Sequence, residues 1–372
     1  MAVPIEAGAM KILHLVNHCR LGHGNVHAAV DLACIQAAKG DVVAYAGEGG
    51  ELRDLLVRSG VDHIPLRQRT GNPRELLQAI VRLRRIVRQR RIDIVHAHMM
   101  AGTVLGYCAT RLTRAALVAT VHNSFDGHSA IMRLADGIAA VSEAERVTLV
   151  QRGFAAHKLV TILNAPLGGA RSLYFADEPP AALARPSIAT VCGLHERKGV
   201  DTIIAAFARV AAAHAAELHI VGDGPDRAKL EAAAAATGFG ARIHFHGSLN
   251  DPQTVLRNTD IFVLASHAEP LGLVNIEARS AGCAIVASNV GGIPEALDHG
   301  AAGLLVPPGD VAAFAEAISG LLRDPAMLAR MKMQARGNLE RFTVERLHAD
   351  YDRLYASLLA SGVASSPWLR GA

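Results

Sequence analysis

Cysteine is scarce in this sequence. Among 372 residues only five are cysteines, and they are scattered, odd in number and without C-x-x-C spacing. Such a set argues against a disulfide framework and against a zinc knuckle, and it favours a reducing cytoplasm in which core thiols are the default. The five are Cys19, Cys34, Cys108, Cys192 and Cys283.

Long apolar runs and a strong net charge are also missing. Although 51% of the residues are hydrophobic, no apolar run approaches the roughly 18 residues that a membrane-spanning helix needs. Residues 1–9 carry no cation and no hydrophobic core of signal-peptide length, so we expect a short tail, no export and a cytoplasmic protein. The net charge of only +4 does not indicate a nucleic-acid partner.

What the sequence does contain is a regular alternation of short β-branched runs and helical segments. It predicts parallel sheets covered by helices, with ligands outside the carboxyl ends of the strands. The length suits two such domains, and Pro179, Pro180 and Pro186 punctuate an irregular linker around residues 168–186. The expected strands are residues 12–16, 42–45, 92–96, 117–121 and 138–141 in the first half, and 188–191, 218–221, 243–245, 261–264, 284–287 and 304–306 in the second.

Residues 269–277 read E-P-L-G-L-V-N-I-E and place two carboxylates eight positions apart. Pro270 and Gly272 separate a buried strand from a helical pattern, so backbone N–H groups near Gly272 would face a ligand at the positive end of a helix dipole. A phosphate is readily held there, and Glu269 and Glu277 can accept bonds from sugar hydroxyls. The alternative is that Glu277 only complements its own helix dipole and that Glu269 is a solvated loop residue.

The neighbouring residues carry a family resemblance. R-S-A-G-C-A-I-V-A-S starts at Arg279, G-G-I-P-E at Gly291 and G-L-L-V-P-P-G-D at Gly303, while G-L-H-E-R-K-G-V-D starts at Gly193 and L-H-I-V-G-D-G-P at Leu218. Together these motifs resemble the retaining glycosyltransferases of family 4. The resemblance covers nearly the whole chain and is most specific in its second half.

The resemblance implies the GT-B fold, an α/β architecture of two Rossmann-like, doubly wound parallel-sheet domains with a cleft between them. We expect an acceptor domain over residues 1–170 and a sugar-nucleotide domain over residues 171–345. Residues 346–372 would form a terminal helix that crosses back to the first domain. That segment shows apolar residues at helical spacing.

The implied reaction moves a sugar from a nucleoside diphosphate to a hydroxyl, so positive charge must meet the leaving diphosphate. Lys198, Arg197 and the helix start near Gly272 can supply it without a metal. The only Asp-x-Asp triplet, residues 350–352, lies on the terminal amphipathic helix, where a solvated face is expected. The family usually carries an arginine where Gly193 stands here, so the second cation is open, with Arg197 as the substitute.

The other site residues also come from the resemblance. Glu277 would accept bonds from the ribose, and Glu269 would lie by the transferred sugar and stabilise its positive charge. His122 aligns with a histidine that contacts the donor sugar, although a lone histidine at a strand end is more often structural. The remaining donor-binding residues would be Gly22, Gly24, Leu271, Gly272, Leu273 and Val274.

Three further features are open to more than one interpretation. Gly22 and Gly24 form a G-x-G in which His27 takes the place of a third glycine, which is weak evidence for a dinucleotide site. The pairs His96/His98 and His244/His246 could each offer two imidazoles on one strand face. No third metal ligand is evident from the sequence, so packing or surface roles are favoured.

Arginine dominates lysine, 32 residues against six, and six arginines crowd the end of a predicted helix over residues 73–91. A solvated face stabilised by the helix dipole is one interpretation. The other is attraction of Arg82–Arg91 to anionic lipid at the inner face of the plasma membrane, where a lipid-linked acceptor would lie.

The sequence therefore predicts a retaining, metal-independent hexosyltransferase that uses a sugar nucleotide, with UDP favoured over GDP because it is commoner in the family. Its acceptor would be a glycan or lipid-linked hydroxyl in bacterial polysaccharide, lipopolysaccharide or glycolipid synthesis. Two alternatives remain open. One is a sugar-nucleotide-binding protein that has lost turnover, and the other is an NAD-dependent oxidoreductase.

Overall fold

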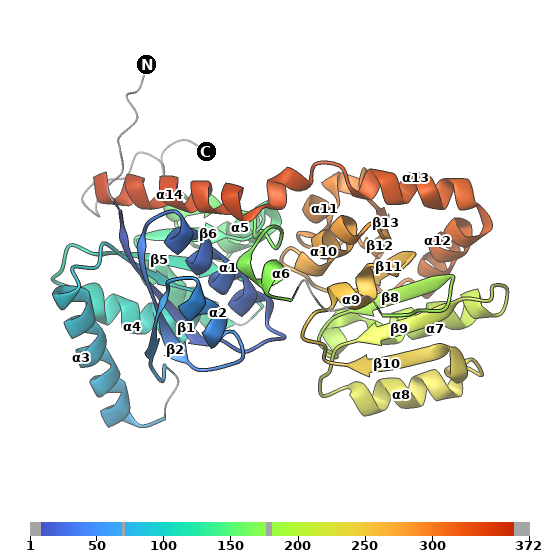
Figure 1. Ribbon diagram of the computed structural model, residues 1–372, viewed down its shortest axis with the longest axis horizontal. Coiled ribbons are helices and arrows are strands. Elements are labelled where there is room, and N and C mark those ends of the chain that lie inside the picture. Colours follow the sequence, from blue (N-terminus) through green and yellow to red (C-terminus); the bar gives the residue numbers. More distant parts are fainter. Residues whose placement is uncertain (1–8, 69–70, 126, 176–180, 361–372) are drawn as a thin grey trace, which may run out of the picture. The chain divides into compact units, whose positions relative to one another are not determined.

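The computed structural model describes residues 9–68, 71–125, 127–175 and 181–360 (Figure 1). It divides into two compact units. The first runs to Tyr174 and takes up the chain again from Thr343, and the second is Phe175–Phe342. Residues 1–8 of the expected tail, and Pro179 and Pro180 of the expected linker, lie outside the described residues.

The first unit is a seven-stranded parallel sheet in the order β3-β2-β1-β4-β5-β6-β7. Its strands are β1 (Lys11–His18), β2 (Val42–Glu48), β3 (Asp62–Pro65), β4 (Ile94–Ala97), β5 (Ala116–Val121), β6 (Gly137–Ala140) and β7 (Leu159–Thr161). Its helices are α1 (Gly24–Ala38), α2 (Arg53–Arg58), α3 (Pro73–Gln89), α4 (Met100–Thr110), α5 (Glu143–Gln151), α6 (Ala170–Tyr174) and α14 (Val344–Ala360), with 3₁₀ turns η1 (Gly127–Leu134) and η2 (Ala156–Lys158).

Side chains alternate between the two faces of this sheet, and each face has its own apolar core. Leu13 and Leu15 of β1 belong to the face covered by α3 and α4. Ile12 belongs to the other face, where α1 and α14 pack against each other (Figure 1). Tyr351 and Tyr355 of α14 are buried there. Helix α14 therefore completes the core on this face of the first sheet.

The second unit is a six-stranded parallel sheet in the order β10-β9-β8-β11-β12-β13. Its strands are β8 (Ser187–Val191), β9 (Glu217–Val221), β10 (Ile243–Gly247), β11 (Ile261–Leu264), β12 (Ala284–Ser288) and β13 (Leu304–Val306). Its helices are α7 (Val200–Ala211), α8 (Arg227–Ala236), α9 (Gln253–Leu256), α10 (Leu273–Ala281), α11 (Ile293–Ala296), α12 (Val311–Arg323) and α13 (Pro325–Ala335), with 3₁₀ turns η3 (Glu196–Lys198), η4 (Gly240–Arg242), η5 (Asp298–Gly300) and η6 (Leu339–Phe342).

Both sheets reverse their strand order at one point, between β1 and β4 in the first and between β8 and β11 in the second. In open α/β sheets the loops leaving such a pair of strands diverge, and ligands bind between them at the carboxyl ends. The expected doubly wound parallel sheets are confirmed, and each contains one such switch point.

A buried arginine anchors helix α10, which follows β11. The Arg279 side chain is fully buried, and its guanidinium donates to the Asp298 carboxylate at 2.8 Å, to the carbonyl of Ala335 at 2.8 Å and to that of Gly337 at 2.6 Å. It also donates to the carbonyl of Ala296. A buried charge is tolerated only when it is paired in this way, so α10 is fixed against α11, η5 and α13.

The sequence interpretation missed two strands of the first sheet. Both β3 and β7 are at its edges, and they have only four and three residues. Edge strands of this length bury little and carry weak alternation, which explains why their pattern was not visible.

Candidate active site

Two predicted loops lie side by side in the second unit. One follows β8 and carries Arg197 and Lys198, and the other follows β11 and carries Glu269. The backbone N–H of His267 donates to the carbonyl of Arg197 at 2.8 Å, and the Arg197 guanidinium donates to the carbonyl of Ala268 at 2.8 Å. These bonds join the loops at the switch point of the sheet.

The Glu269 carboxylate is the centre of this cluster. It forms an ion pair with the Lys198 ammonium, lies 3.8 Å from the Arg197 guanidinium and accepts a hydrogen bond from the Ser266 hydroxyl at 3.3 Å. The exposed fraction of the side chain is 10% for Glu269 and 15% for Lys198, so solvent screens the pair only in part. The predicted cation and the predicted carboxylate are therefore direct neighbours.

Two glycines from the loop after β12 lie against the backbone of Glu269. Gly291 follows β12, and a Cβ atom there would overlap the carbonyl oxygen of Glu269. The neighbouring Gly292 donates its backbone N–H to that same carbonyl at 3.0 Å. In the sequence the Gly291 motif is only a family signal, and the close approach of Glu269 gives this glycine a physical reason.

Helix α10 begins directly after this loop. Its N-cap is Gly272, which has no side chain with which to cap the first backbone N–H groups. Leu271 is buried, whereas Leu273 and Val274 are half-buried. Glu277 is half-buried one turn further along the helix.

Asn275 was missed by the sequence analysis. Its side chain is fully buried in the first turn of α10, and neither its amide oxygen nor its amide nitrogen has a hydrogen-bond partner. Such unpaired buried groups are rare in proteins and call for an explanation. A polar residue between Val274 and Ile276 was the signal in the sequence that could have pointed to it.

In the first unit, the predicted glycines surround the turn from β1 into α1. Gly22 has a positive φ of 80° and is exposed, and Gly24 is the exposed first residue of α1. His27, in place of a third glycine, is half-buried and its Nε2 atom has no hydrogen-bond partner. The turn thus leaves polar backbone accessible at the switch point between β1 and β4.

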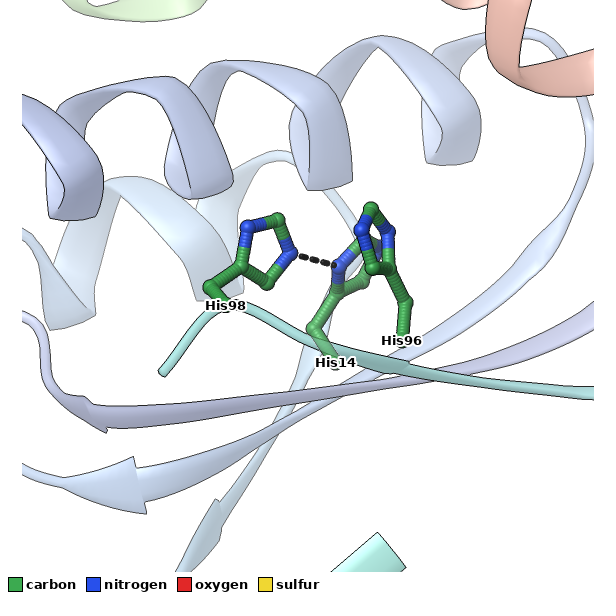
Figure 2. Close-up of side chains that lie close together, drawn as sticks. All are labelled: His14, His96 and His98. Carbon is green, nitrogen blue, oxygen red and sulfur yellow. Dashed lines mark hydrogen bonds between the residues drawn. The ribbon is translucent and has the colours of Figure 1, made fainter. Parts of the chain in front are cut away.

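His122 follows β5 and is the half-buried start of a chain of imidazoles. Its Nε2 atom is 3.2 Å from Nδ1 of His98, and its Nδ1 atom is 3.4 Å from the side-chain nitrogen of Asn164. His98 continues inward, with its Nε2 atom 2.9 Å from Nδ1 of His14 (Figure 2). Nε2 of His14 then lies 2.7 Å from Oε1 of Gln36 on α1.

The structure supplies the third histidine that the sequence did not reveal. His14 and His96 pair across β1 and β4, and one nitrogen from each of His14, His96 and His98 lies within 4.8 Å of the others. Every one of these ring nitrogens already has a partner, because His96 contacts the Thr120 hydroxyl at 2.7 Å and the Tyr355 hydroxyl at 2.6 Å. A metal here would have to break those bonds, so the cluster is best described as a hydrogen-bond network.

A similar cluster occupies the second unit. His219 on β9 joins the pair predicted on β10, with its Nδ1 atom 3.1 Å from Nε2 of His246, while His244 bonds the Glu217 carboxylate at 2.7 Å. The His219 and His244 rings stack at 5.0 Å between centroids. Packing or a surface role is the favoured interpretation of this pair, and both describe it, because His244 is half-buried and His246 is exposed.

Two family models cover most of the chain. Residues 29–165 match the model described as "Glycosyltransferase Family 4", and residues 177–338 match "Glycosyl transferases group 1". The chain belongs to the family 4 glycosyltransferases. Glycogen synthase of Mycobacterium tuberculosis is 28% identical over 74% of this chain and 70% of its own. A lipopolysaccharide core glycosyltransferase of Rhizobium meliloti is 33% identical over 44% of this chain and 47% of its own.

Solved structures confirm the GT-B fold of this glycosyltransferase. A glycosyltransferase from Rickettsia africae superposes with a TM-score of 0.81 at 20% identity, over 95% of this chain and 99% of its own. HepE of Anabaena, solved with UDP and glucose, superposes with a TM-score of 0.79 at 20% identity. The match covers 94% of this chain and 100% of the HepE chain.

The arginine-rich helix α3 of this glycosyltransferase ends at Gln89, and its arginines are partly engaged. Arg82 donates to the carbonyl of Pro65 at 2.8 Å and Arg84 to that of Arg111 at 3.0 Å, while Arg85 and Arg88 are exposed. Within the described part of the chain, no helix is both long and apolar enough to cross a membrane.

The Asp-x-Asp triplet lies on α14, as expected. Asp350 pairs with Arg346 at 2.5 Å and also with Arg353, and the side chain between the two acids, Tyr351, is buried in the core. The carboxylate of Asp350 therefore forms ion pairs with two arginines of its own helix.

Buried imidazoles should make the first unit of this glycosyltransferase acid-sensitive. Burial lowers the pKa of His14 and of His122 from 6.5 to about 4. Between these values the unfolded chain binds protons that the native state does not, so the free energy of unfolding should fall as pH falls, by up to about 1.4 kcal/mol per pH unit for each histidine. Urea unfolding measured across this range would show the slope. His14→Gln should flatten it, and His157→Gln, at an exposed site of the same unit, should not.

Proposed function

We propose that this glycosyltransferase moves a sugar from a nucleoside diphosphate, UDP in preference to GDP, to a hydroxyl acceptor, with retention of configuration and without a metal. The observation that carries the proposal is the cluster of Lys198, Arg197 and Glu269 at the switch point of the second sheet. Support for UDP comes from HepE, which was solved with UDP-glucose.

The cluster suits the charge changes of the reaction. A diphosphate that leaves a sugar gains negative charge, and the Lys198 ammonium, the Arg197 guanidinium and the uncapped start of α10 offer fixed positive charge to meet it. The buried, unpaired amide of Asn275 in that helix start is a further group that a bound ligand could satisfy. Gly193 lacks the side chain of the usual family arginine, so we assign the second cation to Arg197.

Glu269 has the complementary role. The anomeric carbon becomes positively charged as the leaving group departs, and a carboxylate beside it stabilises that charge without forming a covalent bond. Glu277, further along α10, accepts hydrogen bonds from the ribose hydroxyls. In the first unit, His122 contacts the transferred sugar, and Gly22 and Gly24 let the backbone approach the ligand.

The acceptor class rests on relatives and is part of the proposal. The named relatives include glycogen synthase and a lipopolysaccharide core glycosyltransferase, which favours a glycan or lipid-linked acceptor in bacterial polysaccharide, lipopolysaccharide or glycolipid synthesis. The family assignment removes the oxidoreductase alternative. A sugar-nucleotide-binding protein without turnover is the remaining competitor, and the kinetic test below separates the two.

Helix α3 supports a peripheral membrane contact as a second part of the proposal. Leu77 and Val81 are 62% and 51% exposed, and they share the surface of this helix with the exposed Arg85 and Arg88. Apolar side chains among arginines suit the surface of an anionic bilayer.

Donor binding should depend on Glu277. UDP and UDP-sugars should raise the Tm of the wild-type protein more than GDP does, because a ligand stabilises the fold that binds it. Glu277→Gln should weaken UDP binding in calorimetry by about 10- to 150-fold, since a bond from a hydroxyl to a charged group contributes about 1.5 to 3 kcal/mol. Glu316→Gln, an exposed residue on α12 of the same unit, is the matched control. An unchanged Kd for UDP would remove Glu277 from the site.

Turnover should depend on Glu269 and not on a metal. Glu269→Ala should leave UDP affinity nearly intact while kcat falls on the order of 10²-fold or more, because its interaction strengthens only as positive charge develops. Glu231→Gln, in a surface pair on α8, should leave kcat unchanged. Near-normal kcat in well-folded Glu269→Ala would refute the catalytic role.

The same assay tests metal independence, because transfer should continue in EDTA. Activity that is lost in EDTA and restored by Mn²⁺ would refute it. Binding of UDP-sugars with no turnover on any acceptor would favour the binding protein.

Lipid binding should depend on the arginines of α3. Vesicles that contain an anionic lipid should bind the protein, and Arg85→Glu with Arg88→Glu should weaken binding roughly 30-fold, because each surface arginine contributes about 1 kcal/mol. Arg209→Glu with Arg257→Glu changes the net charge equally at exposed sites of the second unit. Equal loss in both double variants would mean that net charge, and not α3, attracts the lipid.

A further inference from the structure

The imidazole chain of the first unit has a direction. A neutral imidazole donates through one ring nitrogen and accepts at the other. If both nitrogens form hydrogen bonds, a ring that accepts from one neighbour must therefore donate to the next. His14, His96 and His98 are fully or almost fully buried. Burial lowers the pKa of these three histidines and of His122, which keeps all four rings of this network neutral. All eight of their ring nitrogens have partners.

The two amides at the ends of the chain define its direction. The Asn164 side-chain nitrogen can only donate, so Nδ1 of His122 accepts and the proton of His122 is on Nε2. His122 then donates to Nδ1 of His98, and His98 donates from Nε2 to Nδ1 of His14. His14 donates from Nε2 to Oε1 of Gln36, which can only accept. Both amides therefore agree on one tautomer for all three rings.

The hydrogen bonds continue beyond Gln36. Its amide nitrogen donates to the Tyr355 hydroxyl at 3.5 Å, that hydroxyl is 2.6 Å from Nδ1 of His96, and Nε2 of His96 is 2.7 Å from the Thr120 hydroxyl. The Thr120 hydroxyl is 2.6 Å from that of Tyr351. Gln36 is thus held on both sides, which opposes the amide flip that would reverse the whole chain.

We propose that His98, His14 and Gln36 are positioning residues that hold His122 in its Nε2–H tautomer, so that Nδ1 of His122 is an acceptor for a sugar hydroxyl. The sugar in this statement rests on the proposed function. His122 is the half-buried member of the four, and its bond to Asn164, at 3.4 Å, is the longest bond in the row from Asn164 to Gln36. A hydroxyl that donates to Nδ1 can replace that bond without disturbing the buried rings.

The tautomer can be read directly in the purified protein. Nitrogen NMR with ¹⁵N-histidine distinguishes the two neutral tautomers, and His122→Gln identifies the signal of His122. The wild-type protein should show His122 as a single Nε2–H form. Gln36→Met, which removes the far end of the chain two rings away, and His98→Phe, which keeps a ring but no nitrogen, should each give a mixture. Gln36→Glu keeps an acceptor there and should restore the single form.

Thr120→Val is the matched control. Thr120 is a buried residue of β5, the strand that His122 follows, and the substitution removes its hydrogen bonds to His96 and Tyr351. In the network these bonds lie beyond Gln36, away from His122. It should lower the Tm while leaving the His122 tautomer single. A mixed tautomer in the wild-type protein, or a single Nε2–H form that persists in both Gln36→Met and His98→Phe, would overturn the proposal. So would a stoichiometric metal found in the purified protein and lost in His14→Gln, because a coordinated nitrogen cannot make these bonds.

Kinetics connect the tautomer to the reaction. With a UDP-sugar as donor, Gln36→Met should lower kcat on the order of 10-fold or more while the Kd for UDP stays unchanged, since the sugar and not the nucleotide meets His122. Gln36→Glu should recover most of kcat. An equal loss of kcat in Gln36→Met and Thr120→Val would contradict the proposal, because packing would then explain both. Absence of transfer in the wild-type protein would count against the proposed function alone, because the NMR result needs no substrate.

Discussion

The reversal of strand order in each sheet is the constraint on which the rest depends. Between β8 and β11 the chain continues toward opposite edges of the sheet, so the loops that leave these strands are not covered by a crossover of their own. That leaves room for charged and polar groups at the carboxyl ends of buried strands. Lys198 and Glu269 come from these two loops. Gly292, from the loop after β12, donates its backbone N–H to the carbonyl of Glu269, and Gly291 lets the two loops approach.

The two units use the same architecture in different ways. In the second, a partly exposed ion pair and a helix start concentrate charge, which suits a ligand with phosphates. In the first, the corresponding position holds neutral imidazoles whose bonds extend from His122 into the core. Neutral rings in a fixed tautomer offer directional hydrogen bonds and little charge. That chemistry suits hydroxyl groups.

Much of the second unit could be predicted from sequence because its signals are local. Strand, turn and helix around Glu269 follow one another within a short stretch, and Arg197 and Lys198 belong to one motif. The histidine network could not be predicted, since its members come from β1, β4, α1 and α14 and meet only after folding. His14 looks like one polar residue in a buried strand. Asn275 was missed for the same reason, because an unpaired amide is visible only once its surroundings are known.

Helix α14 has both apolar and hydrogen-bonding roles, although its sequence pattern indicates only the apolar one. Tyr351, Leu354, Tyr355 and Leu358 follow helical spacing and read as an apolar stripe, and all four are buried in the core of the first unit. The two phenol hydroxyls, however, are the partners of Thr120 and His96. A stripe of leucines would fill the same volume but leave Nδ1 of His96 and the far end of the chain without partners, at the cost of an unpaired buried polar group. Helix α14 therefore gives the first unit specific hydrogen bonds as well as apolar contacts, and these bonds connect it to the network that ends at His122.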